Sequence, residues 1–193
     1  MFACVAENLD LSRLNILLVE DNQFMTQILK NVLRAFGVGS IRNAADGADA
    51  LSILKSFEAD IVISDWKMEP LDGVELTRLI RTASDLRDNT VPIIMVTGHT
   101  ELNRILEARD AGVTEIVRKP VSAKALLSRI EEVIKRPRIF VKSRGYIGPD
   151  RRRRPKPDGM EQERRSQEPQ NILDSTQLSQ EEVNALMAPP EED

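Results

Sequence analysis

Acidic side chains follow two short apolar segments of this 193-residue sequence. Glu20 and Asp21 come directly after the segment 16–19, and Asp65 ends the segment 61–65. Short runs of β-branched and other apolar residues are typical of buried strands, and the carboxyl ends of adjacent parallel strands border one crevice. Three carboxylates in one crevice repel each other and favour a divalent cation. The sequence therefore predicts a magnesium site, because Mg²⁺ prefers oxygen ligands and keeps several of its waters.

A hydroxyl and an ammonium group follow two further strand-like segments. Thr97 ends the fourth such segment and Lys119 follows the fifth. An aspartate that accepts a phosphoryl group needs a metal ion, a hydrogen-bond donor and a cation near the phosphoryl oxygens. It needs no general base, because an aspartate is ionised at neutral pH. Separately, Thr97 could be a helix cap and Lys119 a surface cation, but together these residues predict phosphoryl acceptance by Asp65, with Trp66 beside it as a lid.

Five strand-like segments alternate with five helical patterns between residues 14 and 136. The strands are predicted at 16–19, 40–42, 61–65, 92–97 and 115–117, and the helices at 24–36, 48–57, 73–82, 101–111 and 122–135. Strands and helices that alternate with short connections are typical of a doubly wound α/β fold. We therefore expect a flavodoxin-like, five-stranded parallel sheet of order 2-1-3-4-5, preceded by an N-terminal extension over residues 1–13.

The segment from about residue 15 to residue 135 resembles the receiver domains of response regulators, the CheY-like family. The motifs that carry the resemblance are Glu20-Asp21, Asp65…Met68…Asp72-Gly73, Thr97-Gly98 and Lys119-Pro120. The resemblance implies that Asp65 is the phosphoacceptor and that a sensor histidine kinase or a phosphotransfer protein supplies the phosphoryl group. A protein of this kind signals by self-phosphorylation and is not an enzyme with turnover.

The same resemblance implies roles for the other motif residues. The implied metal ligands are Asp21, Asp65 and the main-chain carbonyl of Lys67, with Glu20 helping through a water molecule. Thr97 is implied as the switch hydroxyl and Lys119 as the partner of the phosphoryl group, with a cis peptide bond between Lys119 and Pro120.

The sequence departs from the family pattern at two positions. Glu69 stands where a proline is usual, with Pro70 one place later, and Ile116 stands where an aromatic residue is common. An aliphatic side chain at position 116 offers neither the ring nor the hydroxyl of a tyrosine for coupling phosphorylation to output.

Charge is unevenly distributed along the chain. Residues 138–156 contain eight basic residues and one acidic residue, whereas residues 157–193 contain two basic and ten acidic residues. Blocks of opposite sign are typical of extended, interacting segments. The single Cys4 suits a reducing cytosol, and the lack of a long apolar run predicts no membrane insertion. We therefore expect a cytoplasmic protein with a disordered arginine-rich arm over 137–170 and an acidic tail over 171–193.

The arginine-rich arm contains a compact pattern of Tyr, Gly, Pro and Arg residues over 144–152. Charge alone favours a solvated basic linker or non-specific phosphate binding. However, arginine reads guanine through a bidentate fork, and Arg and Tyr side chains stack on bases. The segment resembles the arginine-rich stretch of the Cle proteins, CheY-like effectors of cyclic di-GMP that act on the flagellar motor. The resemblance implies dinucleotide contacts from Arg144, Tyr146, Asp150, Arg151 and Arg152.

The acidic tail contains one short amphipathic pattern. Val183, Leu186 and Met187 form an apolar stripe that is too short to persist as an isolated helix in water. The amino-acid sequence of this segment also resembles the N-terminal peptide of the flagellar switch protein FliM, which CheY-like receivers bind. The tail is therefore expected to be a pseudo-ligand, either for its own receiver or for the receiver of another protein.

These observations predict a single-domain response regulator that acts by protein interaction under the control of cyclic di-GMP. Three alternatives remain at this point. The first is a phosphorelay receiver without a second messenger, and the second is a nucleic-acid-binding regulator that uses the arginine cluster. The third is a phosphatase with an aspartate nucleophile, which the sequence disfavours because that chemistry usually needs a second aspartate where Lys67 stands.

Overall fold

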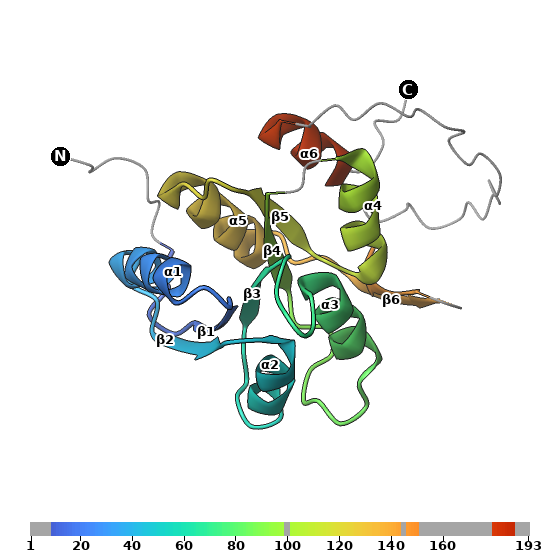
Figure 1. Ribbon diagram of the computed structural model, residues 1–193, viewed down its shortest axis with the longest axis horizontal. Coiled ribbons are helices and arrows are strands. Elements are labelled where there is room, and N and C mark those ends of the chain that lie inside the picture. The colour runs from blue at the N-terminus through green and yellow to red at the C-terminus, as the bar shows by residue number, and fades with distance from the viewer. Residues whose placement is uncertain (1–8, 99–100, 144–145, 151–178, 188–193) are drawn as a thin grey trace.

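The computed structural model describes residues 9–98, 101–143, 146–150 and 179–187 (Figure 1). A parallel sheet forms the centre of the molecule, and its strand order is β2-β1-β3-β4-β5. The predicted doubly wound, flavodoxin-like fold is confirmed. The strands are β1 (Asn15–Val19), β2 (Ser40–Ala44), β3 (Ile61–Asp65), β4 (Ile93–Thr97) and β5 (Glu115–Arg118).

Five helices connect or follow these strands. Several of their ends carry capping groups: the Ser122 hydroxyl accepts a hydrogen bond from the backbone N–H of Ala125, and Gly112 ends a helix in the left-handed conformation. The second helix ends before the predicted residue 57, and in the turn that follows it the backbone N–H groups of Ser56 and Phe57 both bond to the carbonyl of Ile53. The helices are α1 (Gln23–Ala35), α2 (Gly47–Leu54), α3 (Gly73–Thr82), α4 (Leu102–Ala111) and α5 (Ala123–Lys135).

The helices cover the two faces of the sheet, and three clusters of apolar side chains lie between the layers. α1 and α5 pack against one face through residues such as Leu33 and Ile130, which are fully buried. α2 and α3 pack against the other face, and α4 shares a third cluster with β4 and β5. Among the described residues, no helix combines the length and the apolar character that crossing a membrane would require.

The predicted N-terminal extension over 1–13 is partly an element of the domain. Residues 1–8 lie outside the described part of the chain, but Leu11 is buried in the cluster beneath α1 and α5. The carbonyl of Leu11 also accepts hydrogen bonds from the backbone N–H groups of Leu14 and Gly39. The domain therefore begins before residue 14.

A β-hairpin follows α5, so the prediction of a disordered arm over 137–170 is wrong for the residues of its two strands, whereas residues 151–170 lie outside the described part of the chain. β6 (Phe140–Ser143) and β7 (Tyr146–Pro149) pair in antiparallel fashion. The segment contains too few apolar residues for a core of its own, and the hairpin instead docks on α3 and α4. Gly148 and Pro149 are buried there, and the Phe140 ring lies over the guanidinium of Arg81 at 4.8 Å.

The amphipathic helix expected in the tail spans Gln180–Met187, here α6. Figure 1 shows α6 beside α4 and β5 of its own receiver. Val183 and Met187 are buried in the third apolar cluster, whereas the side chain of Leu186 lies outside the description. The sequence left open whether this helix binds its own receiver or that of another protein, and in the structure α6 lies on its own receiver.

Candidate functional site

The three predicted acidic residues converge at the carboxyl ends of β1 and β3. Glu20 and Asp21 follow β1, and Asp65 is the last residue of β3. One carboxylate oxygen from each of the three lies within 4.8 Å of those of the other two. Asp65 and Glu20 are nearly buried, with 7% and 4% of their surface exposed, whereas Asp21 is exposed. The cluster is therefore open to solvent on the side of Asp21.

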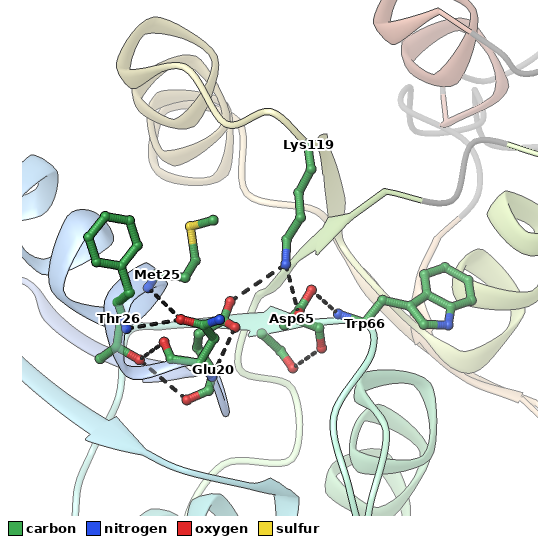
Figure 2. Close-up of polar contacts among 9 residues, drawn as sticks. Glu20, Met25, Thr26, Asp65, Trp66 and Lys119 are labelled. Carbon is green, nitrogen blue, oxygen red and sulfur yellow. Dashed lines mark hydrogen bonds and ion pairs between the residues drawn. The ribbon is translucent and has the colours of Figure 1, made fainter.

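Lys119 reaches into this acidic cluster from the end of β5. Its Nζ lies 2.8 Å from Oδ2 of Asp65 and 3.7 Å from Oε2 of Glu20. Figure 2 shows the lysine side chain extending toward both carboxylates from the opposite side of the crevice. One ammonium partly offsets three carboxylates, so the site keeps an excess of negative charge.

Burial and the neighbouring charges raise the pKa of Glu20. The largest cause is desolvation of its carboxylate, the second is repulsion by Asp65, and attraction by Lys119 opposes both. Ionisation of Glu20 therefore destabilises the folded protein as long as Lys119 is the only cation nearby.

The acidic cluster fits a divalent cation. Oε2 of Glu20 is buried and makes no hydrogen bond to any described residue, so it has an unused lone pair directed into the site. Carboxylate oxygens are the ligands that Mg²⁺ prefers, and the open side at Asp21 leaves room for the waters that this ion retains. Glu20, Asp21 and Asp65 would hold the ion. Lys67 is exposed in the turn after β3, and metal binding by its carbonyl stays a prediction.

Main-chain contacts fix the position of Asp65. The backbone N–H of Trp66 donates a hydrogen bond to Oδ1 of Asp65 at 2.8 Å. The first residue of α3, Gly73, passes so close that a Cβ atom there would lie 2.2 Å from the carbonyl oxygen of Asp65. Glycine is thus required at position 73 for the start of α3 to pack on the end of β3.

Thr97 and Lys119 lie side by side across the ends of β4 and β5. The backbone N–H of Lys119 bonds to the carbonyl of Thr97 at 2.7 Å, and Thr97 is fully buried. The peptide bond between Lys119 and Pro120 is cis, as the sequence predicts, and the one between Glu69 and Pro70 is also cis. The structure thus brings Thr97 and Lys119 to the same edge as Asp65, while their roles toward a phosphoryl group stay predictions.

Trp66 does not cover the site, contrary to the expectation of a lid. Figure 2 shows its indole directed away from the carboxylates. The side chain is 5% exposed and belongs to the third apolar cluster, together with Ile116, Val183 and Met187. Trp66 therefore links the acidic cluster to the apolar residues that pack on α6. The sequence around Trp66 does not indicate this link.

Tyr146 and Asp150, the two described residues of those expected to contact a dinucleotide, are far from this acidic cluster. β7 packs near Gly112, at the amino end of β5, whereas Asp65 lies at the carboxyl end of β3. The Tyr146 hydroxyl donates a hydrogen bond to the carbonyl of Pro149 at 2.8 Å, and the backbone N–H of Asp150 donates one to the carbonyl of Ile139. The three predicted arginines of this group lie outside the described residues: Arg144, Arg151 and Arg152.

We expect the Glu20→Gln protein to be more stable than the native protein at pH 8 when no divalent cation is present. The pKa of Glu20 is higher in the folded protein than in the unfolded chain, so the folded state binds more protons between the two values. The stability that the protonated Glu20 contributes is therefore lost as the pH rises through that interval. The uncharged glutamine avoids the loss. Thermal unfolding with EDTA should show a higher midpoint for the variant.

Adding Mg²⁺ should reverse this order, because the cation stabilises the ionised carboxylate that only the native protein has. The exposed Glu58 offers a matched control, and Glu58→Gln should change neither the midpoint nor the response to Mg²⁺. A Glu20→Gln midpoint at or below that of the native protein in EDTA would contradict the electrostatic account of the site.

Comparisons with known proteins agree with this geometry. Residues 16–131 match the family model described as the response regulator receiver domain. The chemotaxis protein CheY of Pseudomonas aeruginosa is 37% identical over 123 residues, which cover 64% of this chain and 98% of that protein. The chemotaxis protein CheY-3 of Vibrio cholerae is 34% identical over 123 residues, which cover 64% of this chain and 93% of that protein.

Solved structures give the same result. The chemotaxis response regulator CheY4 of Vibrio cholerae aligns with a TM-score of 0.57 at 28% identity, over 62% of this chain and 98% of that one. The receiver domain of the sensor histidine kinase PA1611 of Pseudomonas aeruginosa aligns with a TM-score of 0.57 at 29% identity, over 63% of this chain and 98% of that one. That structure has a magnesium ion coordinated in its active site cleft. With its sheet order, its acidic cluster and the family match over most of the folded domain, this chain belongs to the response regulator receiver domain family.

Proposed function

We propose that this protein is a response regulator that accepts a phosphoryl group on Asp65 from a sensor histidine kinase or a phosphotransfer protein. The observation that carries the proposal is the contact of 2.8 Å between the nearly buried Asp65 and the Lys119 ammonium, beside two further carboxylates. An ionised carboxylate is a nucleophile, and the flanking cation stabilises the negative charge of the group that it receives.

The chemistry assigned to the chain is a single transfer. An oxygen of the Asp65 carboxylate forms a bond to the donor's phosphorus, while the bond from phosphorus to the donor breaks and its electron pair leaves with the donor. Lys119, now in contact with Asp65, would bind a phosphoryl oxygen, and the Thr97 hydroxyl would donate a hydrogen bond to another. When bound, Mg²⁺ supplies positive charge that offsets the negative charge of the phosphoryl oxygens.

A small acyl-phosphate donor tests this proposal without knowledge of the cognate kinase. In the presence of Mg²⁺, such a donor should increase the intact mass of the protein by one phosphoryl group, and EDTA should prevent the increase. Labelling at the same rate in EDTA would contradict the metal-dependent mechanism.

We further propose that the segment around β7 binds cyclic di-GMP and that the protein acts by protein interaction on the flagellar motor, with FliM as the partner. Three observations support this. The sequence from Arg144 to Arg152 resembles that of known effectors, the hydrogen bonds of Tyr146 and Asp150 hold the end of β7 that precedes Arg151, and the relatives reported above are chemotaxis proteins. A segment that is already ordered before binding reduces the entropy loss that a ligand must offset.

Calorimetry with cyclic di-GMP tests the binding of the dinucleotide to the full chain. Arg151→Ala and Arg152→Ala should each weaken binding by about 1–3 kcal/mol if the arginine forms a bidentate contact with guanine. Arg164→Ala, which removes an arginine that lies outside the 144–152 pattern, is the matched control and should leave the affinity unchanged. Equal affinity for a dinucleotide without guanine, with a steep dependence on salt, would instead indicate non-specific binding to phosphate, as expected of a nucleic-acid-binding regulator.

A further inference from the structure

The outer edge of the central sheet is paired with a side chain of α6. β5 is the last strand of the sheet, so the backbone groups on its outer side have no neighbouring strand. Oε1 of Gln180 accepts a hydrogen bond from the backbone N–H of Arg118 at 2.7 Å, and its Nε2 donates one to the carbonyl of Ile116 at 3.3 Å. The glutamine amide thus makes the pair of hydrogen bonds that one residue of an adjacent parallel strand would make.

Two apolar side chains anchor α6 beside this amide. Val183 and Met187 are separated by one helical turn, so they point to the same side of α6. They are 0% and 3% exposed and pack in one cluster with Ile105 and Ala108 of α4 and with Ile116 of β5. We use the term α6 groove for the surface that these three residues form with Arg118.

A guanidinium closes the far end of α6. Nη2 of Arg138 donates a hydrogen bond to the carbonyl of Met187 at 2.9 Å, and its Nη1 donates one to the carbonyl of Thr114 at 3.3 Å. A cation at the carboxyl end of a helix is favourable because it satisfies a free carbonyl and interacts with the helix dipole. α6 is therefore recognised at its start, along its apolar stripe and at its end.

We propose that α6 is a built-in competitor that shields the α6 groove from a partner protein, and that the partner presents an amphipathic helix with the same contacts. Such a helix would carry a side-chain amide at the position of Gln180 and a β-branched apolar residue three positions later, as at Val183. A long apolar residue would follow four positions after that, as at Met187. This inference deepens the part of the proposed function in which the protein acts by protein interaction. It needs neither phosphorylation nor a dinucleotide.

The size of α6 makes its docking reversible. A helix of two turns is unstable by itself in water, so α6 forms only while the groove supports it. Its advantage over a partner is that it belongs to the same chain, which gives it an effective concentration on the order of millimolar at the groove. A partner helix with the same contacts must therefore bind much more weakly to the native protein than to a protein whose α6 cannot dock.

A competition experiment tests this inference in the full chain. A fluorescent peptide with the sequence of residues 172–193 is titrated into the native protein and into the Val183→Asp variant, which places a charge in the groove and disables the tethered helix. The peptide should bind the variant at least tenfold more tightly than the native protein. The exposed Glu181 provides the control, because Glu181→Ala should bind the peptide as weakly as the native protein does.

Peptide variants test how the groove recognises a helix. Exchanging the residue equivalent to Gln180 for leucine removes two hydrogen bonds to β5 and should weaken binding to the Val183→Asp protein about tenfold. In the full chain, Gln180→Ala should shift peptide affinity in the same direction as Val183→Asp but less. This second variant keeps the test valid if Val183→Asp lowers the stability of the domain, which thermal unfolding will show.

The possible results separate clearly. Equal affinity of the peptide for the native and the Val183→Asp protein would overturn the proposal. So would the absence of saturable binding to that variant up to about millimolar peptide, because a helix with weaker affinity could not stay docked at the effective concentration of its own tether. All titrations use unphosphorylated protein without dinucleotide, so their failure would leave the phosphoacceptor and the cyclic di-GMP proposals untouched.

Discussion

The Asp65→Asn protein should accept no phosphoryl group from a small acyl-phosphate donor under conditions that label the native protein completely. The asparagine amide has nearly the same shape as the carboxylate, and its oxygen can still accept the hydrogen bond from the backbone N–H of Trp66. The fold should therefore persist. The amide is not a useful nucleophile toward phosphorus, and it also removes one of the carboxylates that would hold Mg²⁺, so we expect complete loss of labelling rather than a slower reaction.

Intact-mass spectrometry of the native and variant proteins, with Mg²⁺ and with EDTA, measures this effect. Asp85 is a suitable control residue because it is an exposed aspartate that pairs with Lys55 at the surface, and Asp85→Asn should be labelled like the native protein. A mass increase that survives Asp65→Asn would place the phosphoacceptor elsewhere. Equal loss of labelling in Asp85→Asn would point to a general effect on the domain.

The central sheet and the acidic cluster could be predicted because local patterns determine both. The three inner strands, β1, β3 and β4, are short runs of mostly apolar, buried residues, and the order of strands and helices leaves few arrangements. Once the strands are parallel, residues directly after them must lie at one edge. Asp65, Thr97 and Lys119 were therefore placed together correctly from sequence alone, although no two of them are close in the chain.

The segments after α5 could not be predicted in the same way, because their structure depends on contacts with a surface that only the folded domain provides. The hairpin has few apolar residues and reads as a charged linker, yet it packs on α3 and α4. Gln180 carries no local signal for pairing with a strand, since the β5 edge exists only after the sheet has formed. Likewise, nothing near Trp66 in the sequence indicates that its neighbours include Val183.

Arg81 links the hairpin to the domain, because the Phe140 ring of β6 packs on its guanidinium. It lies in the last turn of α3, and only 1% of it is exposed. Its Nε and Nη2 both donate hydrogen bonds to the carbonyl of Gly112, its Nη1 donates one to the carbonyl of Asn89, and Phe140 of β6 covers the guanidinium. Burial lowers the pKa of Arg81 to about 10, so these contacts must offset a substantial desolvation cost.

Arg81→Ala should lower the free energy of unfolding by about 3 kcal/mol, because it leaves a cavity under Phe140 and two carbonyl oxygens without their donor. Relief of the desolvation cost offsets part of this loss, which is why the expected value is below the sum of the separate effects. Urea unfolding followed by circular dichroism measures the change. The hairpin should also lose protection from amide exchange, since two strands without a supporting surface are at best marginally stable.

The same helix provides the matched control. Arg78 lies one turn earlier on α3 and forms an exposed ion pair with Glu107, so Arg78→Ala removes the same side chain from a surface position. Exposed pairs of this kind contribute less than about 1 kcal/mol, and we expect Arg78→Ala to leave both the stability and the exchange of the hairpin amides close to native. If the two variants were equally stable, the hairpin would be held by its other contacts, such as the close packing of Gly148 on Gly112, and not by the guanidinium of Arg81.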